Sequence, residues 1–364
     1  MSGNGEASGR WDEHMGHAAR IALRGHGGAE PNPMVGCVIV GPDGRTIAEG
    51  HHRRCGGPHA EIEALRRAGD RARGATAVVT LEPCNHHGRT GPCSLALARA
   101  GVARVVYACA DPNPAAAGGA ATLREAGIEV LHVPHPAAER ATAPFLVRVR
   151  HGRPWTVAKW AESSDGRIAT RPGEPRWISG ERSRAMVHRE RARCDAVLTG
   201  MGTVLRDDPL LTVRGTRAGR APLRVVWDPR LGLPVGSALV RTAHQSPLLC
   251  ACTPKALESR ADHAQALRTA GVEVAAFDDV AALSRALLAR GTSTLLVEAG
   301  PGLVRPMIDA GLVDLAWVFT SPHALGDVGA NGDAPVARDR LERLPCWWRG
   351  MRGPDRVALY RVPT

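Results

Sequence analysis

A histidine, a glutamate and two cysteines among the first hundred residues constrain this chain most strongly. His59-Ala60-Glu61 is followed 22 residues later by Pro83-Cys84, and Cys93 lies nine residues beyond Cys84. One imidazole and two thiolates supply three protein ligands for zinc and leave the fourth coordination position open for water. Zinc lowers the pKa of bound water to about 7, and a carboxylate that is not a ligand can carry its proton. The pattern predicts a catalytic zinc site with Glu61 as its acid/base group.

Short buried strands alternate with helices around this motif. Apolar runs and turn signals predict strands over residues 34–40, 46–52, 75–81, 102–108 and 128–133, and helices over residues 12–24, 58–68, 94–100 and 120–126. This alternation predicts an α/β fold with a mixed or largely parallel sheet covered on both faces. His59 and Glu61 then lie in the first turn of one helix, and Cys84 and Cys93 bracket the start of another. Sites in such sheets form where strand ends meet helix starts.

The combined spacing is more specific than its parts. His-Ala-Glu alone is an ordinary helix start, and two cysteines separated by eight residues are a weak signal. His-x-Glu followed by Pro-Cys is the signature of zinc deaminases, which replace the amine of a heterocycle by oxygen. Deaminases of nucleobases and nucleic acids place only two residues between the cysteines. Here eight residues intervene, His86 and Arg89 among them, and this longer loop departs from that class.

The length of 364 residues suggests about two domains. Residues 1–11 are small and polar and lack the apolar core of a signal peptide, so a disordered lead-in is expected there. Residues 134–144 are rich in proline and alanine, and His151-Gly152-Arg153-Pro154 follows shortly after. These features predict a boundary near residue 150, with one domain over residues 12–149 and another over residues 150–364.

Charge and cysteine usage limit the location and the partners. Nine cysteines, an odd and scattered number, indicate a reducing compartment, so a cytoplasmic protein is expected. A net charge of +11 suits a phosphorylated substrate, an acidic partner or nucleic acid. The basic residues are spread along the chain without interleaved aromatic residues, so nucleic acid is not an expected partner. No apolar run approaches the roughly 20 residues that span a bilayer, so no membrane association is expected.

The second half also reads as α/β. Strands are expected over residues 155–160, 196–199, 223–227, 246–252, 272–276, 295–297 and 314–320. Ser179 is expected to cap a helix that runs to Arg193. The strand-to-helix turn at residues 298–303 presents backbone N–H groups that suit a phosphate. It lacks the full Gly-x-Gly-x-x-Gly pattern, so taken alone it favours a plain tight turn.

Four stretches of the first half resemble the bifunctional riboflavin-biosynthesis deaminase/reductase family in order and spacing. They are residues 31–37, 59–61, 80–93 and 111–114. The resemblance implies a cytidine-deaminase-like three-layer α/β/α domain with one zinc ion on His59, Cys84 and Cys93, and Glu61 as proton shuttle. It further implies that substrate is bound by Asn32, His52, His86, Asp111 and Asn113, with Arg89 on the ribose phosphate. Departures from the family pattern are Asn85 (for serine), Gly91 (for proline) and residues 115–119, where an arginine is missing.

The second half resembles the reductase domain of the same family. The matching phrases lie within residues 158–167, 177–180, 191–196, 202–214 and 297–301, and with the first half the resemblance covers residues 12 to 330. It implies a dihydrofolate-reductase-like α/β fold that uses NADPH. Substrate-facing residues would be Lys159, Arg191, Leu211, Arg214 and Glu298. The residues that contact NADPH would be Ala161, Trp177, Thr203, Asp207, Gly300, Pro301, Gly302, Leu303, Val304, Arg305 and Pro306. Pro175 stands at a substrate position where relatives carry serine.

The resemblance implies a two-step activity on one phosphorylated pyrimidine. The first domain would deaminate 2,5-diamino-6-ribosylamino-4(3H)-pyrimidinone 5′-phosphate, and the second would reduce its ribosyl group to ribityl with NADPH. A homo-oligomer, dimeric or tetrameric, is expected. His86 and Arg89 lie in the loop from Cys84 to Cys93, here called the zinc loop. They would then bind a pyrimidinone that carries a phosphate, since a planar guanidinium suits phosphate.

Three other interpretations follow from the departures and the motif. A diverged paralogue would act on a related aminopyrimidine in a secondary pathway; residues 115–119 and Pro175 favour it. A nucleic-acid or nucleobase deaminase is disfavoured by the long zinc loop. A non-catalytic binding protein is disfavoured by the intact His59, Glu61, Cys84 and Cys93.

Overall fold

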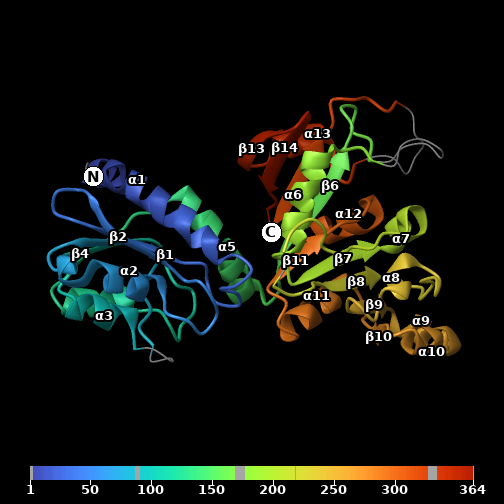
Figure 1. Ribbon diagram of the computed structural model, residues 1–364, viewed down its shortest axis with the longest axis horizontal. Helices are drawn as coiled ribbons and strands as arrows, with labels where there is room; N and C mark the ends of the chain where they lie inside the picture. Colours follow the sequence, from blue (N-terminus) through green and yellow to red (C-terminus); the bar gives the residue numbers. More distant parts are fainter. Residues whose placement is uncertain (1–2, 87–90, 169–176, 218, 327–333, 364) are drawn as a thin grey trace. The chain divides into compact units, whose positions relative to one another are not determined.

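The computed structural model describes residues 3–86, 91–168, 177–217, 219–326 and 334–363 (Figure 1). The chain divides into two compact units, Met1–Gly152 and Arg153–Thr364. The sequence placed this division after residue 149. Each unit has its own sheet and its own core. Both halves are therefore α/β, as the sequence predicted.

The first unit contains a mixed sheet of five strands in the order β2-β1-β3-β4-β5. The strands are β1 (Gly36–Val40), β2 (Thr46–His51), β3 (Thr76–Leu81), β4 (Arg104–Cys109) and β5 (Glu129–His132). β1 runs antiparallel to β2 and β3, whereas β3, β4 and β5 are parallel. Every residue of β1 and β3 is buried, as expected for central strands covered on both faces.

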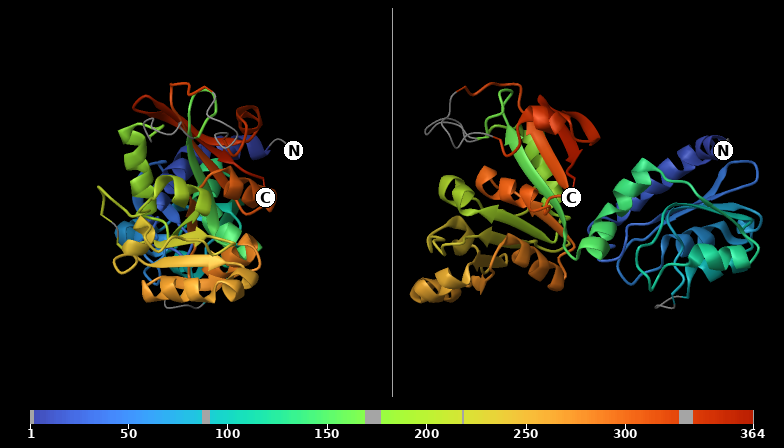
Figure 2. Two further views of the ribbon diagram at one scale, coloured as in Figure 1. Left: turned by 90° about the vertical axis from the view of Figure 1, so that its right-hand side faces the viewer. Right: turned by 180° about the vertical axis from the view of Figure 1, so that it is seen from behind.

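Two layers of helices cover this sheet (Figures 1 and 2). Helices α1 (Gly3–Ala22) and α5 (Pro136–His151) pack together on one face. Helices α2 (Ala60–Ala68), α3 (Cys93–Arg99) and α4 (Gly119–Glu125) cover the other. The predicted three-layer α/β/α arrangement is therefore present. A short 3-10 turn follows α1 (Leu23–Gly25), and another follows α2 (Gly69–Ala72).

The N-terminal helix is longer than the sequence predicted. α1 begins at Gly3, so residues 3–11 are helical and not a disordered lead-in. Trp11 is only 4% exposed, and the guanidinium carbons of Arg10 and Arg104 lie 5.1 and 5.7 Å from its ring centroid. This buried aromatic anchors the helix one residue before the predicted start, and the preceding turns continue from it.

The proline-rich stretch near the boundary is also helical. The sequence treated residues 134–144 as a boundary segment, but α5 spans Pro136–His151. Pro136 occupies the first turn, where its missing N–H costs nothing, and the His135 ring accepts a hydrogen bond from the Ala137 N–H. Phe145 and Val147 are buried, so packing against the sheet compensates for Pro144 inside the helix.

The second unit contains a sheet of nine strands in the order β10-β9-β8-β7-β11-β6-β12-β14-β13. The strands are β6 (Trp155–Glu162), β7 (Ala196–Gly200), β8 (Leu223–Trp227), β9 (Leu248–Cys252), β10 (Glu273–Ala276), β11 (Thr294–Val297), β12 (Leu315–Thr320), β13 (Cys346–Arg352) and β14 (Asp355–Arg361). The strands from β10 to β12 are all parallel. β14 and β13, coloured red in Figures 1 and 2, add an antiparallel hairpin at one end.

The helices of this unit lie between successive strands of the chain. They are α6 (Glu181–Arg191), α7 (Met201–Asp207), α8 (Ala238–Arg241), α9 (Pro254–Ser259), α10 (Ala261–Thr269), α11 (Val280–Ala289), α12 (Pro301–Asp309) and α13 (Arg338–Glu342). None of the described helices of the chain combines the length and the apolar composition needed to cross a membrane.

The predicted cap of α6 is wrong. Gly180, not Ser179, is the N-cap residue, and it has no side-chain cap. A carboxylate distant in sequence holds the start of this helix, because Asp355 Oδ2 accepts hydrogen bonds from the Gly180 N–H at 2.8 Å and the Ser183 hydroxyl at 2.5 Å. Local sequence could not show this, since Asp355 lies in β14.

A close approach at Gly50 positions the helix that carries the zinc-site motif. An added Cβ at Gly50 would lie 2.3 Å from the Ala60 carbonyl oxygen and 2.5 Å from the Ala64 nitrogen. Strand β2 therefore meets the first turn of α2 backbone to backbone. His59 is the N-cap of this helix and Glu61 lies in its first turn, so the contact sets the place of both.

We expect Gly50→Ala to push α2 away from β2, to destabilise the first unit by about 1–3 kcal/mol, and to reduce the zinc content of the purified protein. Thermal unfolding and metal analysis measure the two effects. Gly9→Ala in α1 is the matched control, since nothing lies within 4 Å of a Cβ there. A Gly50→Ala protein that melts and binds zinc like the wild type would contradict this account of α2.

Candidate active sites

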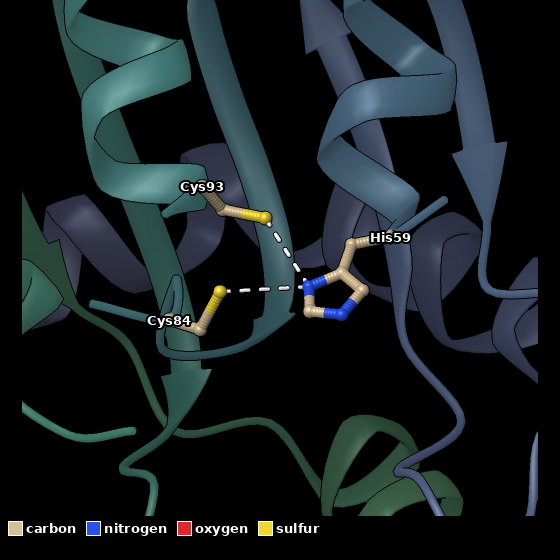
Figure 3. A group of neighbouring side chains, drawn as sticks. All are labelled: His59, Cys84 and Cys93. Atoms are coloured by element: carbon tan, nitrogen blue, oxygen red, sulfur yellow. Dashed lines mark hydrogen bonds between the residues drawn. The ribbon is translucent and has the colours of Figure 1, made fainter. Parts of the chain in front are cut away.

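Three potential zinc ligands meet in the first unit (Figure 3). His59 precedes α2, Cys84 follows β3, and Cys93 is the first residue of α3. His59 Nδ1 lies 3.5 Å from Cys84 Sγ and 3.4 Å from Cys93 Sγ. The three donor atoms all lie within 4.8 Å of one another. The structure thus brings together the three residues that the sequence proposed.

The donor set fits tetrahedral zinc. Zn–S bonds of about 2.3 Å and a Zn–N bond of about 2.0 Å at tetrahedral angles require N···S separations of about 3.5 Å. The two N···S separations, 3.5 and 3.4 Å, match this requirement. Three protein ligands of this kind leave one coordination position for water, which is the pattern of catalytic and not of structural zinc.

Electrostatics distinguish the two thiols, because their mutual hydrogen bond raises the pKa of Cys93 while it lowers that of Cys84. The hydrogen bond from the Cys93 thiol, reinforced by the His59 ring, holds the pKa of Cys84 well below its usual value. Glu61 is 3% exposed, and burial raises the pKa of its carboxyl group. Glu61 also shares a hydrogen bond with Cys93, so its carboxylate lies beside the ligand cluster. A buried carboxylate with a raised pKa is suited to accept and return a proton near neutral pH.

Glu82, which the sequence analysis did not single out, braces the segment that carries Cys84. Its Oε1 accepts hydrogen bonds from the N–H groups of Gly118 at 3.2 Å and Ala120 at 3.1 Å, and its Oε2 accepts from Asp111 N–H at 3.4 Å. A Cβ at Gly119 would lie 1.8 Å from the Pro83 carbonyl oxygen. The start of α4 is therefore fastened directly to the zinc loop. The Glu-Pro-Cys order was visible in the sequence, but the partners of Glu82 were not.

The segment that departs from the family pattern packs on two of the candidate zinc ligands. Ala116 is buried in one cluster with Cys84 and Cys93. Its carbonyl oxygen accepts a hydrogen bond from the Asn85 N–H at 2.9 Å. Asn85 Oδ1 in turn accepts from the Ser94 hydroxyl at 2.8 Å. Asn85 and residues 115–119 therefore form part of the wall of the site.

Other predicted substrate residues surround the cluster. His52 is 2% exposed; its Nδ1 lies 2.9 Å from the Pro58 carbonyl oxygen and its Nε2 lies 3.3 Å from Asn32 Nδ2. The His52 and His59 ring centroids lie 5.4 Å apart, and those of His59 and His86 6.4 Å apart. Burial lowers the pKa of His52, so this ring is neutral, with Nδ1–H donating to Pro58 and Nε2 accepting from Asn32.

Asp111 and Asn113 lie in the segment braced by Glu82. Asp111 Oδ1 accepts from the Asn113 N–H at 2.9 Å, and Asn113 Oδ1 accepts from the Ala115 N–H at 3.2 Å. These two turns order the segment that leads to Ala116. Arg89 and Pro175 lie outside the described residues.

A second cluster of charged residues lies in the second unit. Arg191 of α6 forms a two-pronged ion pair with Glu298, which follows β11; its Nη2 donates to Oε2 at 2.7 Å. Lys159 of β6 interacts electrostatically with both, and burial lowers the pKa of its ammonium group. Its Nζ lies 5.4 Å from the Phe319 ring centroid. The structure thus brings Lys159, Arg191 and Glu298 together as predicted.

The segment from Leu211 to Arg214 adjoins this cluster. Arg191 Nη1 donates to the Thr212 carbonyl oxygen at 3.1 Å, next to Leu211, which is 3% exposed with a φ of 52°. Arg214 is exposed and acts electrostatically on His188. His188, which the sequence analysis missed, lies one turn before Arg191 in α6, and its Nδ1 is buried without a hydrogen-bond partner among the described residues. Helical spacing from Arg191 was the available signal.

The predicted NADPH residues group around two helix starts. β7 and β11 are neighbouring parallel strands, and each is followed by a helix, α7 with Thr203 and Asp207, and α12 with Pro301 to Pro306. A Cβ at Gly200 would lie 3.5 Å from Leu303 Cβ, so the two starts adjoin. Ala161 belongs to β6, the other neighbour of β11. The carboxyl ends of adjacent parallel strands are where such sheets bind dinucleotides.

Several of the predicted NADPH residues are buried or already contact other parts of the protein. Leu303 and Val304 are buried. Arg305 donates to the carbonyl oxygens of Pro335 and Ala334 at 3.1 and 3.0 Å. Trp177 is 57% exposed, with the Arg184 guanidinium carbon 5.1 Å from its ring centroid.

Comparison with known families agrees with the division into two units. The family model of the cytidine and deoxycytidylate deaminase zinc-binding region matches residues 10–109. The family model of the RibD C-terminal domain matches residues 154–338. The protein is therefore a two-domain enzyme, in which a zinc-binding deaminase domain is followed by a reductase domain. Membership of the reductase family implies a nicotinamide cofactor.

Curated relatives and solved structures extend over nearly the whole chain. The riboflavin biosynthesis protein RibD of Escherichia coli is 40% identical over 328 residues, which cover 86% of this chain and 88% of that protein. RibD of Mycobacterium tuberculosis is 40% identical and covers 94% of this chain and 95% of its own. A structure of Acinetobacter baumannii RibD superposes with a TM-score of 0.78 at 35% identity and covers 98% of this chain and 99% of that one. This chain belongs to the RibD family of riboflavin biosynthesis proteins.

We expect Cys84→Ala to lower bound zinc from about one ion per chain to nearly none, because two protein ligands do not hold catalytic zinc tightly. Metal analysis of the purified protein measures this. Cys109→Ala is the matched control, since Cys109 is equally buried at the end of β4 but lies against Thr142. Full zinc content in the Cys84→Ala protein would contradict the assigned ligands.

Proposed function

We propose that the chain catalyses two consecutive steps of riboflavin biosynthesis. The first unit hydrolyses the C2 amine of 2,5-diamino-6-ribosylamino-4(3H)-pyrimidinone 5′-phosphate, with water consumed and ammonia released. The second unit reduces the ribosyl group of the product to ribityl, with NADPH as the donor of a hydride to C1′. The observation that carries the proposal is the tetrahedral fit of His59, Cys84 and Cys93 beside the buried carboxylate of Glu61. A Thermotoga maritima structure, 31% identical with a TM-score of 0.80 and covering 98% of this chain, bears the name of a deaminase and reductase of this kind.

In the proposed deaminase site, His59, Cys84 and Cys93 hold one zinc ion. Zinc in such a site supplies activated water at neutral pH. Glu61 would take a proton from water and deliver it to the leaving amine, for which its raised pKa suits it. The Glu61 carboxylate is buried next to Cys93. The burial shields its proton from bulk water between the two proton transfers.

Polar groups around the zinc site bind the pyrimidinone. The Asn32 amide nitrogen donates a hydrogen bond to His52 Nε2. The amide oxygen Oδ1 of Asn32 therefore remains to accept a hydrogen bond from a ring N–H of the substrate. His86, Asp111 and Asn113 line the substrate side of the site, and Arg89 contacts the phosphate. A guanidinium is suited to that contact because it donates two parallel hydrogen bonds to phosphate oxygens.

In the proposed reductase site, Lys159, Arg191, Leu211, Arg214 and Glu298 hold the deaminated pyrimidine. Arg214 supplies the cation for the ribose phosphate, since Arg191 already has a bidentate carboxylate partner in Glu298. NADPH would supply the hydride, and the residues that would hold it are Ala161, Trp177, Thr203, Asp207 and the turn from Gly300 to Pro306. Gly302 lies in the first turn of α12, where backbone N–H groups have no intrahelical acceptor and can bind a phosphate oxygen.

The assembly and location complete the proposal. We propose a homo-oligomer, a dimer or a tetramer, in the cytoplasm. All nine cysteines are free thiols in the structure, as a reducing compartment allows.

We expect Glu61→Gln to lower ammonia release by about 10²–10⁴-fold, because the amide cannot carry the proton. Zinc content should stay near one ion per chain, since Glu61 is not a ligand. Ammonia is measured by a coupled assay and zinc by metal analysis.

The same Glu61→Gln protein contains its own control. When it is given the already deaminated pyrimidine, it should oxidise NADPH at the wild-type rate, because Glu61 belongs to the first unit only. Wild-type ammonia release by the zinc-loaded variant would overturn the assigned role of Glu61.

A further inference from the structure

A fully buried arginine lies in the second unit outside the residues assigned above. Arg224, in β8, is 0% exposed and is the largest fully buried side chain of the chain's described residues. No carboxylate forms a salt bridge with it within the described ranges. Burial lowers the pKa of its guanidinium to about 10, so the group stays charged at neutral pH. Such a cation is costly to desolvate, and its partners show what it achieves.

The guanidinium of Arg224 ties two backbone segments to β8. Nη1 donates to the Leu210 carbonyl oxygen at 3.1 Å and to Thr242 Oγ1 at 2.8 Å. Nη2 donates to the Thr242 carbonyl oxygen at 3.1 Å and to the Ser246 carbonyl oxygen. Residues 242 and 246 follow α8, whereas Leu210 immediately precedes Leu211 of the proposed substrate site. Only a fork of several N–H groups can serve all of these acceptors at once.

The segment that Arg224 holds has an unfavourable backbone. Asp208 and Leu211 both have positive φ, 36° and 52°, although neither is glycine. Left-handed conformations at such residues persist only where their surroundings impose them, and they cluster at functional sites. Three contacts do so here. Asp208 Oδ1 accepts from the Ala238 N–H at 2.6 Å, Arg224 holds the carbonyl of residue 210, and Arg191 holds that of residue 212.

The two arginines hold the segment from opposite sides of Leu211. Arg191 is paired with Glu298 inside the proposed site, so Thr212 is tied to the charged cluster. Arg224 ties Leu210 to β8 and to the end of α8. Without Arg224, the Leu210 carbonyl loses its donor, and Leu211 is free to return to an ordinary conformation, which would change what this segment presents to a substrate.

We propose that Arg224 is a positioning residue of the reductase. It keeps residues 210–212 in the arrangement that receives the pyrimidine substrate, and it does so without touching that substrate. The inference rests on the proposed reductase function and adds to it a residue that acts through the backbone of its neighbours.

The test compares Arg224→Lys with wild type in the full-length, zinc-loaded protein. Lysine keeps the charge but donates from one nitrogen, so it cannot reach Leu210, Thr242 and Ser246 together. We expect the KM for the deaminated pyrimidine to rise about tenfold, which corresponds to about 1.4 kcal/mol. The KM for NADPH and the rate of ammonia release should change less than twofold.

Two further variants separate positioning from general stability. Arg153→Lys changes another buried arginine, which precedes β6, is 5% exposed and donates to both carboxylate oxygens of Asp314, the residue before β12. It should lower the melting temperature and leave the pyrimidine KM unchanged. Thr242→Val removes one acceptor of Arg224 with little change of shape, so the pyrimidine KM should rise about two- to threefold.

The outcomes are distinct. A selective rise in the pyrimidine KM in Arg224→Lys, absent in Arg153→Lys, supports the proposal; if Arg224→Lys does not fold, Thr242→Val decides by the same measure. An unchanged pyrimidine KM in folded variants, or an equal rise for NADPH, overturns it while the reductase function stands. A wild-type protein that oxidises no NADPH with the deaminated pyrimidine overturns the proposed reductase function and this inference with it.

Discussion

The meeting of one imidazole and two thiols at a single point constrains most of the first unit. Their donor atoms come from the start of α2, the end of β3 and the start of α3. N···S separations of 3.4 and 3.5 Å require these elements to be held in place. Gly50 lets β2 approach the start of α2, and Gly119 lets α4 approach Pro83, because a Cβ at either position would strike backbone. Glu82 then fastens α4 to the same loop. The fold thus provides the close contacts that a three-ligand site requires.

In the second unit, buried charged groups hold the segments of the proposed substrate site in place. Arg191 and Glu298 neutralise each other inside the proposed site, with Lys159 beside them. Arg224 is compensated by carbonyl dipoles instead of a carboxylate. Buried ions are poor stabilisers in themselves, so their value lies in the arrangement that they impose. Here that arrangement is the left-handed backbone around Leu211, which no local preference would select.

Features that depend on local sequence were predictable. The spacing of His59, Cys84 and Cys93 indicated the metal cluster, and alternating strands and helices indicated the α/β class of both units. Features that depend on distant partners were not. Asp355 replaces Ser179 in capping α6 from a strand 175 residues away, and the hairpin of β13 and β14 lies in a part of the chain that resembles the family less. The early start of α1 was also not predictable, because the burial of Trp11 depends on tertiary packing.

The central claim is that one chain carries out both reactions on one phosphorylated pyrimidine. The most direct test gives the wild-type protein the 2,5-diaminopyrimidinone ribose phosphate with and without NADPH, and follows ammonia and NADPH separately. The account predicts ammonia release in both cases, and NADPH oxidation that begins after ammonia appears and approaches one equivalent. Ammonia without NADPH oxidation would leave only the deaminase, and the absence of ammonia from zinc-loaded protein would contradict the account.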